Sequence, residues 1–295
     1  MTRLRLATIS HAMRTVWING EWLPEAEAKV SVFDRGLLFA QSVYEVVPVI
    51  AAKPVNWQYH SARLAKSLAL VRIAGGVDWL EVFTGLIARN DLQEGRIYLQ
   101  MTGGVAADRD FLAPSPPPSP TCIAFTQVAP VIDNPVAESG LRVMLAPDER
   151  WGLRSAKTTQ LLYAVLMKEA AHDAGFDDAW LVEDGVVTEA TSANAHIIDT
   201  RGVLVSHPVD HGVLPGVTRI SVIEIAREMG LIVEERPFAP DELFAAREAF
   251  ISSASALVLP VVEVDGKPVG NGGPGVVSAE LRRRYVTRLL QQIAD

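Results

Sequence analysis

The sequence predicts a mixed α+β fold. Short β-branched runs separated by turn dipeptides indicate hairpins, and these alternate with amphipathic segments that have helical spacing. The alternation follows no regular strand–helix–strand order, which argues against a parallel βαβ fold. The chain has 295 residues, of which 49% are hydrophobic and 21% charged, so it is long enough for one large domain or two modest lobes.

The first half of the chain opens with a hairpin signal. Asn19-Gly20 separates two apolar runs within 16–23, and this dipeptide is the strongest short-range indicator of a hairpin turn. Pro48 lies inside a β-branched run and has no N–H for a strand ladder, so part of that run is expected at an edge or a bulge. The strands predicted after the hairpin are 42–50, 95–104 and 121–130.

Two helices are predicted between these strands. Apolar residues recur at helical spacing within 60–74, and Gly75-Gly76 is the expected end of that helix. Asp78 is the expected N-cap of the second helix, which continues the same apolar spacing. The proline-rich stretch 110–120 is expected to have no regular structure, because proline interrupts both helices and ladders.

The stretch 129–135 is the expected linker between a small N-terminal lobe, 1–128, and a larger lobe, 136–295. Beyond the linker the pattern changes to hairpins that alternate with helices. The hairpins are expected at 179–190 and 193–207, the helices at 161–171, 217–229, 239–246 and 279–293, and further strands at 141–147, 231–238 and within 249–269.

Composition argues against several classes of protein. The net charge is −8 with acids and bases interspersed, so no basic face for nucleic acid is indicated. No stretch is apolar for the roughly 18 residues that a membrane span needs. Cys122 is the single cysteine, which indicates a core residue in a reducing, cytoplasmic compartment. Residues 1–15 lack the apolar core of a secretory signal and are expected to form a loosely packed extension.

The histidines offer no metal site. The six histidines are scattered, and no metal-binding motif is present. His207 and His211 lie close together in the sequence, but two histidines in a loop are more often surface residues. We therefore expect no metal centre.

Lys157 is the first candidate for chemistry. It lies just before the predicted helix 161–171 and has no carboxylate nearby in the sequence. The N-terminal end of a helix is unfavourable for a cation, and a neutral amine can attack a carbonyl carbon to form a Schiff base. Taken alone, a lysine here is more often a solvated side chain on an exposed turn.

Two further groups complete a candidate site. Glu189 ends a predicted strand, where a carboxylate can hold a protonated ring nitrogen by a charge-assisted hydrogen bond. The helix start after Gly216 offers backbone N–H groups and the Thr218 hydroxyl to a phosphate, and Arg63 and Ser255 offer further donors. An amine, a carboxylate and an anion cradle are the parts that a pyridoxal phosphate site needs.

The order of motifs resembles the fold-type IV class of pyridoxal-phosphate enzymes, which includes the D-amino-acid and branched-chain aminotransferases. The resemblance runs from about Val16 to the C-terminal helix. The matching blocks are "DRGLLFAQSVYEVV", "HSARLAKSL", "RIYLQMTGG", "AKTTQLLYAVL", "VVTEATSAN", "LPGVTR" and "ISSASALVLPVVEVDGKPV". The resemblance implies a pyridoxal 5′-phosphate cofactor and a small N-terminal α/β lobe beside a larger C-terminal lobe. It also implies an active site between the lobes, at a homodimer interface.

The resemblance assigns roles to individual residues. Lys157 corresponds to the lysine that bonds covalently to the cofactor and carries protons, and Glu189 to the glutamate that binds the pyridine nitrogen. Tyr44 corresponds to a substrate-side tyrosine. The remaining cofactor positions are matched by Arg63, Val217, Thr218 and Ser255, which correspond to phosphate-binding positions, and by Leu214, which corresponds to a leucine that packs on the ring.

The substrate-binding positions depart from the family pattern. Pro48 stands where the D-amino-acid branch has a lysine, and Val46 stands where the branched-chain enzymes have a glycine. Arg109 corresponds to the arginine of a carboxylate-binding loop that the partner subunit supplies, but Phe111 stands at the position of that loop's histidine. The resemblance therefore implies an intact cofactor site and an altered carboxylate site.

We expect a pyridoxal-phosphate transaminase that moves an amino group from a D-amino acid to a 2-oxo acid in a ping-pong reaction. Two alternatives of the same fold stay open. One is an (R)-selective amine transaminase, favoured by Pro48 and Phe111, and the other is a branched-chain L-amino-acid transaminase or, more remotely, a lyase. A non-catalytic α+β binding protein with Lys157 and Glu189 as surface charges is the alternative from another class.

Overall fold

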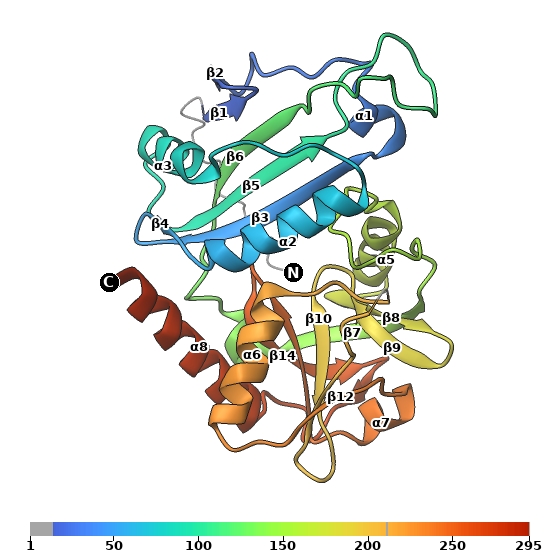
Figure 1. Cartoon of the computed structure of the whole chain (residues 1–295). Coiled ribbons are helices and arrows are strands. Elements are labelled where there is room, and N and C mark those ends of the chain that lie inside the picture. Colours follow the sequence, from blue (N-terminus) through green and yellow to red (C-terminus); the bar gives the residue numbers. More distant parts are fainter. Residues whose placement is uncertain (1–13, 211, 295) are drawn as a thin grey trace.

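The computed structural model describes residues 14–210 and 212–294, and the strands of these residues form two sheets (Figure 1). Most of the expected N-terminal extension, and His211, lie outside the described residues. The six-stranded sheet has the order β2-β1-β6-β5-β3-β4, and all its neighbours are antiparallel. Its strands are β1 (Thr15–Ile18), β2 (Glu21–Pro24), β3 (Ser42–Ile50), β4 (Lys53–Pro54), β5 (Gly95–Thr102) and β6 (Cys122–Val128).

The nine-stranded sheet is mixed. Its order is β12-β11-β10-β13-β14-β7-β8-β9, with β15 paired to β14. The pairs β11–β12, β14–β7 and β7–β8 are parallel, and the other pairs are antiparallel. Its strands are β7 (Leu141–Pro147), β8 (Asp178–Glu183), β9 (Val186–Ala190), β10 (Asn194–Ile198), β11 (Leu204–Ser206), β12 (Val233–Glu235), β13 (Glu248–Ser253), β14 (Leu257–Val264) and β15 (Lys267–Pro268).

Helices cover both sheets. The helices of the described residues are α1 (Arg35–Phe39), α2 (Trp57–Leu70), α3 (Trp79–Arg89), α4 (Val136–Ser139), α5 (Leu162–Asp173), α6 (Val217–Glu228), α7 (Pro240–Ala245) and α8 (Val276–Ala294). Leu64 of α2 and Phe83 of α3 belong to one buried cluster with Val47 of β3. Figure 1 shows α6 and α8 beside the second sheet, where Tyr285 of α8 belongs to a cluster with Phe250 of β13. None of the described helices is long and apolar enough to cross a membrane.

Local signals from the sequence are confirmed at several places. Asn19 and Gly20 form the turn of the β1–β2 hairpin, with φ values of 51° and 97°. Asp78 caps α3 by accepting hydrogen bonds from the N–H groups of Leu80 and Glu81. Cys122 is buried, and burial raises the pKa of its thiol to about 11.

Pro48 lies at the edge that the sequence predicts. β3 pairs along its length with β5, whereas β4 covers only its last residues, Val49 and Ile50. Pro48 therefore needs no N–H on its outer side. The β3–β5 register continues past Pro48 without a shift, so the alternative of a bulge does not occur.

The predicted end of α2 is wrong. The helix ends at Leu70, before Gly75-Gly76, because Arg72 adopts a left-handed conformation with φ of 57°. The Ile73 N–H donates to the Leu68 carbonyl and the Arg72 N–H to the Ala69 carbonyl, at 3.0 and 3.3 Å. This is the Schellman arrangement, and it closes the helix without glycine.

We predict that Arg72→Gly stabilises the protein. A left-handed conformation costs a side-chain-bearing residue about 1 kcal/mol, which glycine avoids. Lys66→Gly is the matched control, because Lys66 is exposed in the middle of the same helix and glycine there should destabilise by about 1 kcal/mol. Thermal unfolding of both variants should show midpoint shifts of opposite sign, and two shifts of the same sign would contradict the assignment.

Candidate active site

One cavity among the described residues is lined from both sheets. Tyr44 and Arg96 reach it from the first sheet, and Glu189 and Asn194 reach it from the second. Of the residues expected from the sequence, the cavity brings together Tyr44, Arg63, Lys157, Glu189, Leu214, Val217, Thr218 and Ser255. Arg109 does not line it.

The backbone around Lys157 is held against the edge of β3. The Tyr44 N–H donates to the Lys157 carbonyl at 3.0 Å, and the Thr159 N–H donates to the Ser42 carbonyl at 3.2 Å. The Lys157 N–H donates to Ser67 Oγ of α2 at 3.0 Å. The lysine is therefore fixed by elements that lie far apart in the sequence.

The helix predicted after Lys157 is confirmed as α5, which begins at Leu162, and Lys157 lies in the irregular segment before it. The field of a helix terminus falls off within its first turn, so the helix dipole does not explain the chemistry of this lysine. Its position comes from pairing with β3 instead.

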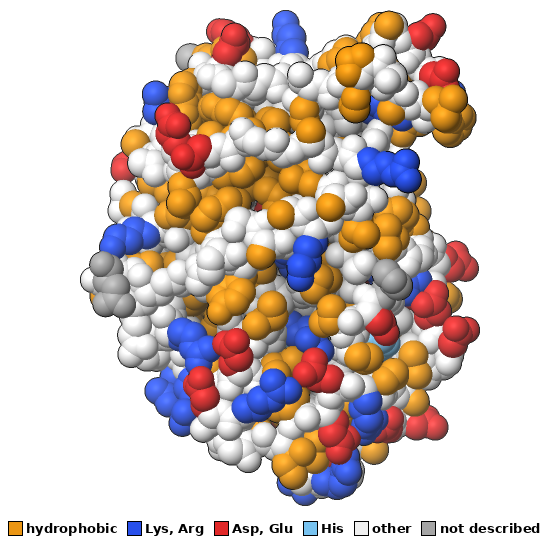
Figure 2. All heavy atoms as spheres, viewed as in Figure 1, with side chains coloured by type: hydrophobic (Ala, Val, Ile, Leu, Met, Phe, Trp, Pro, Cys, Tyr) orange, Lys and Arg blue, Asp and Glu red, His pale blue; other side chains and the backbone are white. Residues whose placement is uncertain are grey.

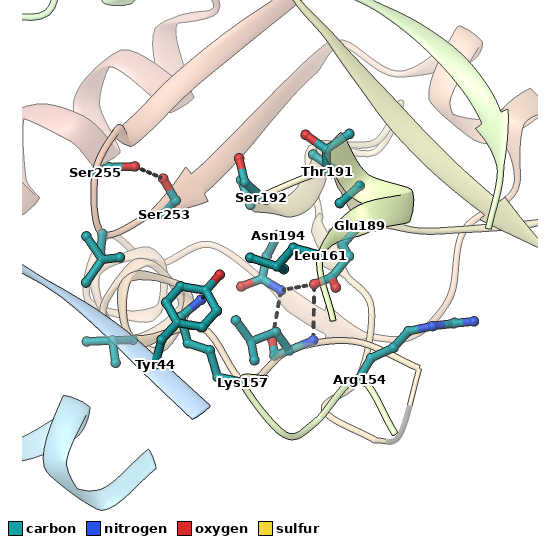
Figure 3. Close-up of a pocket in the computed structure, with 18 of the residues that line it drawn as sticks. Tyr44, Arg154, Lys157, Leu161, Glu189, Thr191, Ser192, Asn194, Ser253 and Ser255 are labelled. Atoms are coloured by element: carbon teal, nitrogen blue, oxygen red, sulfur yellow. Dashed lines mark hydrogen bonds between the residues drawn. The ribbon is translucent and has the colours of Figure 1, made fainter. Parts of the chain in front are cut away.

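The Lys157 amine points at Tyr44 (Figure 3). Its Nζ donates to the Tyr44 hydroxyl at 3.2 Å and lies 4.2 Å from the centre of the tyrosine ring. The Tyr44 ring in turn stacks on Tyr98, with 5.5 Å between ring centres. No described carboxylate forms an ion pair with Lys157, which keeps the amine available inside the cavity.

Glu189 is a buried carboxylate with several donors. Its Oε2 accepts from Asn194 Nδ2 and from the Leu214 N–H, both at 3.1 Å, and its Oε1 accepts from Arg150 Nη1 at 2.5 Å. Burial raises the pKa of Glu189, and the charge and hydrogen bond of Arg150 oppose that rise. Figure 3 shows Glu189 beside Asn194 on the wall opposite Tyr44.

Sequence reasoning missed Arg150 and its partner Asp148. Arg150 donates to both oxygens of Asp148, at 2.9 and 2.6 Å, and also contacts Glu189. Arg154 joins the same network through Asp148 and Glu183. The stretch "PDERWGLRSAK" concentrates charges just before Lys157, but charges in a loop are ordinarily solvated, so this signal is weak.

Arg63 is positioned by another buried carboxylate, Glu45. Its Nε and Nη2 donate to the two Glu45 oxygens at 2.8 and 2.6 Å, and its Nη1 donates to the Pro215 carbonyl at 3.1 Å. His60 Nδ1 lies 2.8 Å from Glu45 Oε2. Each Nη atom of Arg63 keeps one further N–H, so Arg63 can still bind an anion in the cavity.

The start of helix α6 offers free hydrogen-bond donors where the sequence predicts an anion cradle. Gly216 is the N-cap, and the N–H groups of the first helical turn have no partner inside the helix. A side chain at Gly216 would collide with Asn194 Oδ1, so only glycine lets this turn approach β10 so closely. Thr218 and Ser255 add hydroxyls to the same cavity.

Arg109 lies elsewhere in the described chain. It is exposed in the loop between β5 and β6, with its guanidinium 5.2 Å from the centre of the Phe39 ring and 5.3 Å from that of Phe111. Arg35 holds this loop by donating to the carbonyls of Asp110 and Phe111. Within one chain, Arg109 therefore has no contact with the cavity.

The fold and this cavity identify the family. The profile of the family described as Amino-transferase class IV matches residues 42–264. The chain belongs to the class IV aminotransferases, and it is an enzyme that uses pyridoxal phosphate. The alternative of a non-catalytic binding protein is thereby excluded.

Curated relatives match nearly the whole chain. The D-alanine aminotransferase of Bacillus licheniformis is 33% identical over 282 residues, which cover 95% of this chain and 98% of that protein. The D-alanine aminotransferase of Staphylococcus aureus (strain COL) is 33% identical over 92% of this chain and 97% of its own length.

Solved structures share the fold. The branched-chain amino acid aminotransferase of Escherichia coli is similar with a TM-score of 0.84 and 25% identity, covering 94% of this chain and 95% of that one. The T.th. branched-chain amino acid aminotransferase with pyridoxamine 5′-phosphate has a TM-score of 0.84 and 26% identity, covering 94% of each chain. The expected α+β, fold-type IV architecture is confirmed.

The donor set of the cavity fits a pyridoxal phosphate. Arg63, Thr218 and the free N–H groups of α6 suit the phosphate, which needs donors and positive charge. Glu189 suits a protonated ring nitrogen, and Lys157 suits the carbonyl carbon. Leu214 also lines the cavity, and its N–H donates to Glu189.

We predict a pH-dependent contribution of Glu45 to stability. Burial alone would raise the pKa of Glu45, but Arg63 and His60 lower it from 4.5 to about 2. A depressed folded-state pKa adds stability above the ordinary value, and that stability is lost as the pH falls from 4.5 through 2. Glu45→Gln should therefore cost about 3–5 kcal/mol near pH 7, because Arg63 is left unpaired, and less near pH 3.

Urea denaturation at both pH values measures this difference. Glu263→Gln is the control, because Glu263 pairs with the exposed Arg142 and such surface pairs contribute only about 0–1 kcal/mol. If the free energies of unfolding of the wild type and Glu45→Gln differ as much at low pH as near pH 7, the prediction is contradicted.

Proposed function

We propose that this enzyme is a homodimeric D-amino-acid aminotransferase that passes the amino group to a 2-oxo acid. The observation that carries the chemistry is the pairing of Lys157 with Tyr44 across the cavity from Glu189. Support for a D-amino acid comes from the relatives, which are D-alanine aminotransferases at 33% identity over most of the chain.

In this proposal Lys157 is the covalent and proton-transferring residue. When bound, pyridoxal phosphate supplies an aldehyde and an electron-withdrawing ring. The amine of Lys157 holds and moves protons at Nζ, and Tyr44 fixes that amine through its hydroxyl. The backbone pairing with β3 restrains Lys157. Little conformational entropy is therefore lost when a substrate binds.

Glu189 and the anion cradle are proposed to orient the cofactor. Glu189 would accept a hydrogen bond from the ring nitrogen, while Arg150 and Asn194 keep its two oxygens in place. A carboxylate held in this way favours a protonated ring nitrogen through a charge-assisted hydrogen bond. The phosphate positions proposed are Arg63, Val217, Thr218 and Ser255, with Leu214 against the ring.

The homodimer is supported by an exposed apolar surface. Phe33, Leu37, Val105, Phe111 and Leu112 are all exposed on or near α1 and the long loop that follows β5. Figure 2 shows hydrophobic side chains gathered at the upper right, where Figure 1 places α1. Surfaces of this kind mark protein–protein contacts, and we propose a second copy of this chain as the occupant.

Dimerisation would also explain how Arg109 could take part in substrate binding. This arginine lies beside the rings of Phe39 and Phe111. In the proposed dimer it contacts the substrate of the partner subunit. We further propose that the two sheets belong to separate lobes, 1–128 and 136–295, joined at 129–135.

We predict that Lys157→Ala abolishes turnover and covalent attachment of the cofactor. Borohydride should fix the cofactor to the wild-type chain and not to the variant, because no other lysine lines the described cavity. Lys168→Ala is the control, since Lys168 is exposed on α5 and pairs with Asp178. Mass spectrometry of the reduced proteins measures attachment, and turnover by Lys157→Ala would refute the role.

A panel of amino donors, measured by the oxo acid or ketone that each donor releases, decides the substrate. With 2-oxoglutarate as acceptor, we expect D-alanine to react faster than L-leucine and (R)-1-phenylethylamine. The (R)-amine remains the second candidate, because Arg109 lies outside the described cavity and Pro48 offers no charge to a carboxylate. Strong use of L-leucine beside failure of D-alanine would refute our choice.

A further inference from the structure

Strand β5 presents one polar face to the cavity side of its sheet. Arg96, Tyr98 and Gln100 are half-buried and alternate with the buried Ile97 and Leu99. The register sets Arg96 beside Pro48 of β3 and Gln127 of β6. Arg96 and Gln127 both line the cavity that holds Lys157.

Arg96 is the one arginine of the cavity without a carboxylate among the described residues. Arg63 is bound by Glu45, and Arg150 by Asp148 and Glu189. Arg154 is bound by Asp148 and Glu183. On the same face as Arg96, the Tyr98 hydroxyl donates to Gln100 Oε1 at 2.8 Å.

No described acid of the cavity can neutralise Arg96. Glu189 is the only carboxylate among the described lining residues, and its oxygens are already held by Arg150, Asn194 and Leu214. Pro48, the neighbour on β3, has no polar side chain. Burial lowers the pKa of Arg96, as expected for a partly desolvated guanidinium that no acid offsets.

From this charge balance we infer that Arg96 binds a carboxylate of the substrate. A guanidinium presents paired N–H donors that match the two oxygens of a carboxylate, and the Gln127 amide beside it can add another donor. A half-buried charge is stabilised when a ligand completes its hydrogen bonds. The inference rests on the proposed function, because amino acids and 2-oxo acids both carry such a group.

Binding of unreactive ligands tests this inference without turnover. Propionate carries the carboxylate, and propionamide has nearly the same shape without the charge. Titration of the wild-type holoenzyme should show tighter binding of propionate. Arg96→Gln should weaken propionate binding by about 10- to 100-fold and leave propionamide unchanged, since hydrogen bonds to charged groups contribute that much.

Two further variants test whether the paired donors of Arg96 are responsible for propionate binding. Arg96→Lys keeps the charge but not the paired donors, so it should bind propionate with intermediate affinity. Arg142→Gln is the matched control, because Arg142 is exposed on β7 and paired with Glu263. Titration of each apoprotein with pyridoxal phosphate should give equal affinities, which separates substrate binding from cofactor binding. Unchanged propionate binding by Arg96→Gln, or an equal loss for propionamide, would overturn the inference.

Kinetics distinguish which carboxylate is bound. If Arg96 holds the α-carboxylate, Arg96→Gln raises KM for both D-alanine and D-glutamate while kcat changes less. If it holds the distal carboxylate of a dicarboxylic substrate, only D-glutamate and 2-oxoglutarate are affected. An enzyme that binds propionate through Arg96 but fails to use any D-amino acid would refute the proposed donor and leave this inference standing.

Discussion

The site depends on the backbone pairing between β3 and the segment that carries Lys157. Two hydrogen bonds, from the Tyr44 N–H to the Lys157 carbonyl and from the Thr159 N–H to the Ser42 carbonyl, add this segment to an otherwise open strand edge. An open edge exposes unpaired backbone groups, so the pairing stabilises the strand while it fixes the lysine. The same pairing brings Tyr44 within hydrogen-bonding distance of the lysine amine.

The charges of the cavity are organised in networks that leave specific groups free. Glu45 and Asp148 are buried carboxylates that hold Arg63 and Arg150 in place. Buried ion pairs contribute little net stability, because desolvation offsets much of the attraction, so their benefit here is orientation. Arg96 stands apart from these networks, and for that reason its charge is available to a ligand.

Local structure was largely predictable because its causes are local. The Asn19-Gly20 turn and the Asp78 cap depend on residues within one turn of the chain. The end of α2 was mispredicted because Arg72, rather than a glycine, adopts the left-handed conformation, and burial of Ile73 against Leu68 favours that closure. Glu45, Arg150 and Asn194 were missed because their partners lie on other strands and loops.

The family and its cofactor could be recognised from the amino-acid sequence, because ordered motifs identify them without any knowledge of distances. How Lys157 is held, which acids pair with which arginines, and where Arg109 and Arg96 lie could be seen only in the folded chain. The physical reason is that charge balance in a cavity is a sum over groups from several elements. In the sequence, nothing distinguishes Arg96 from other strand arginines. In the fold it differs from the other arginines of the described cavity, because Glu45 is paired with Arg63 and Glu189 with Arg150.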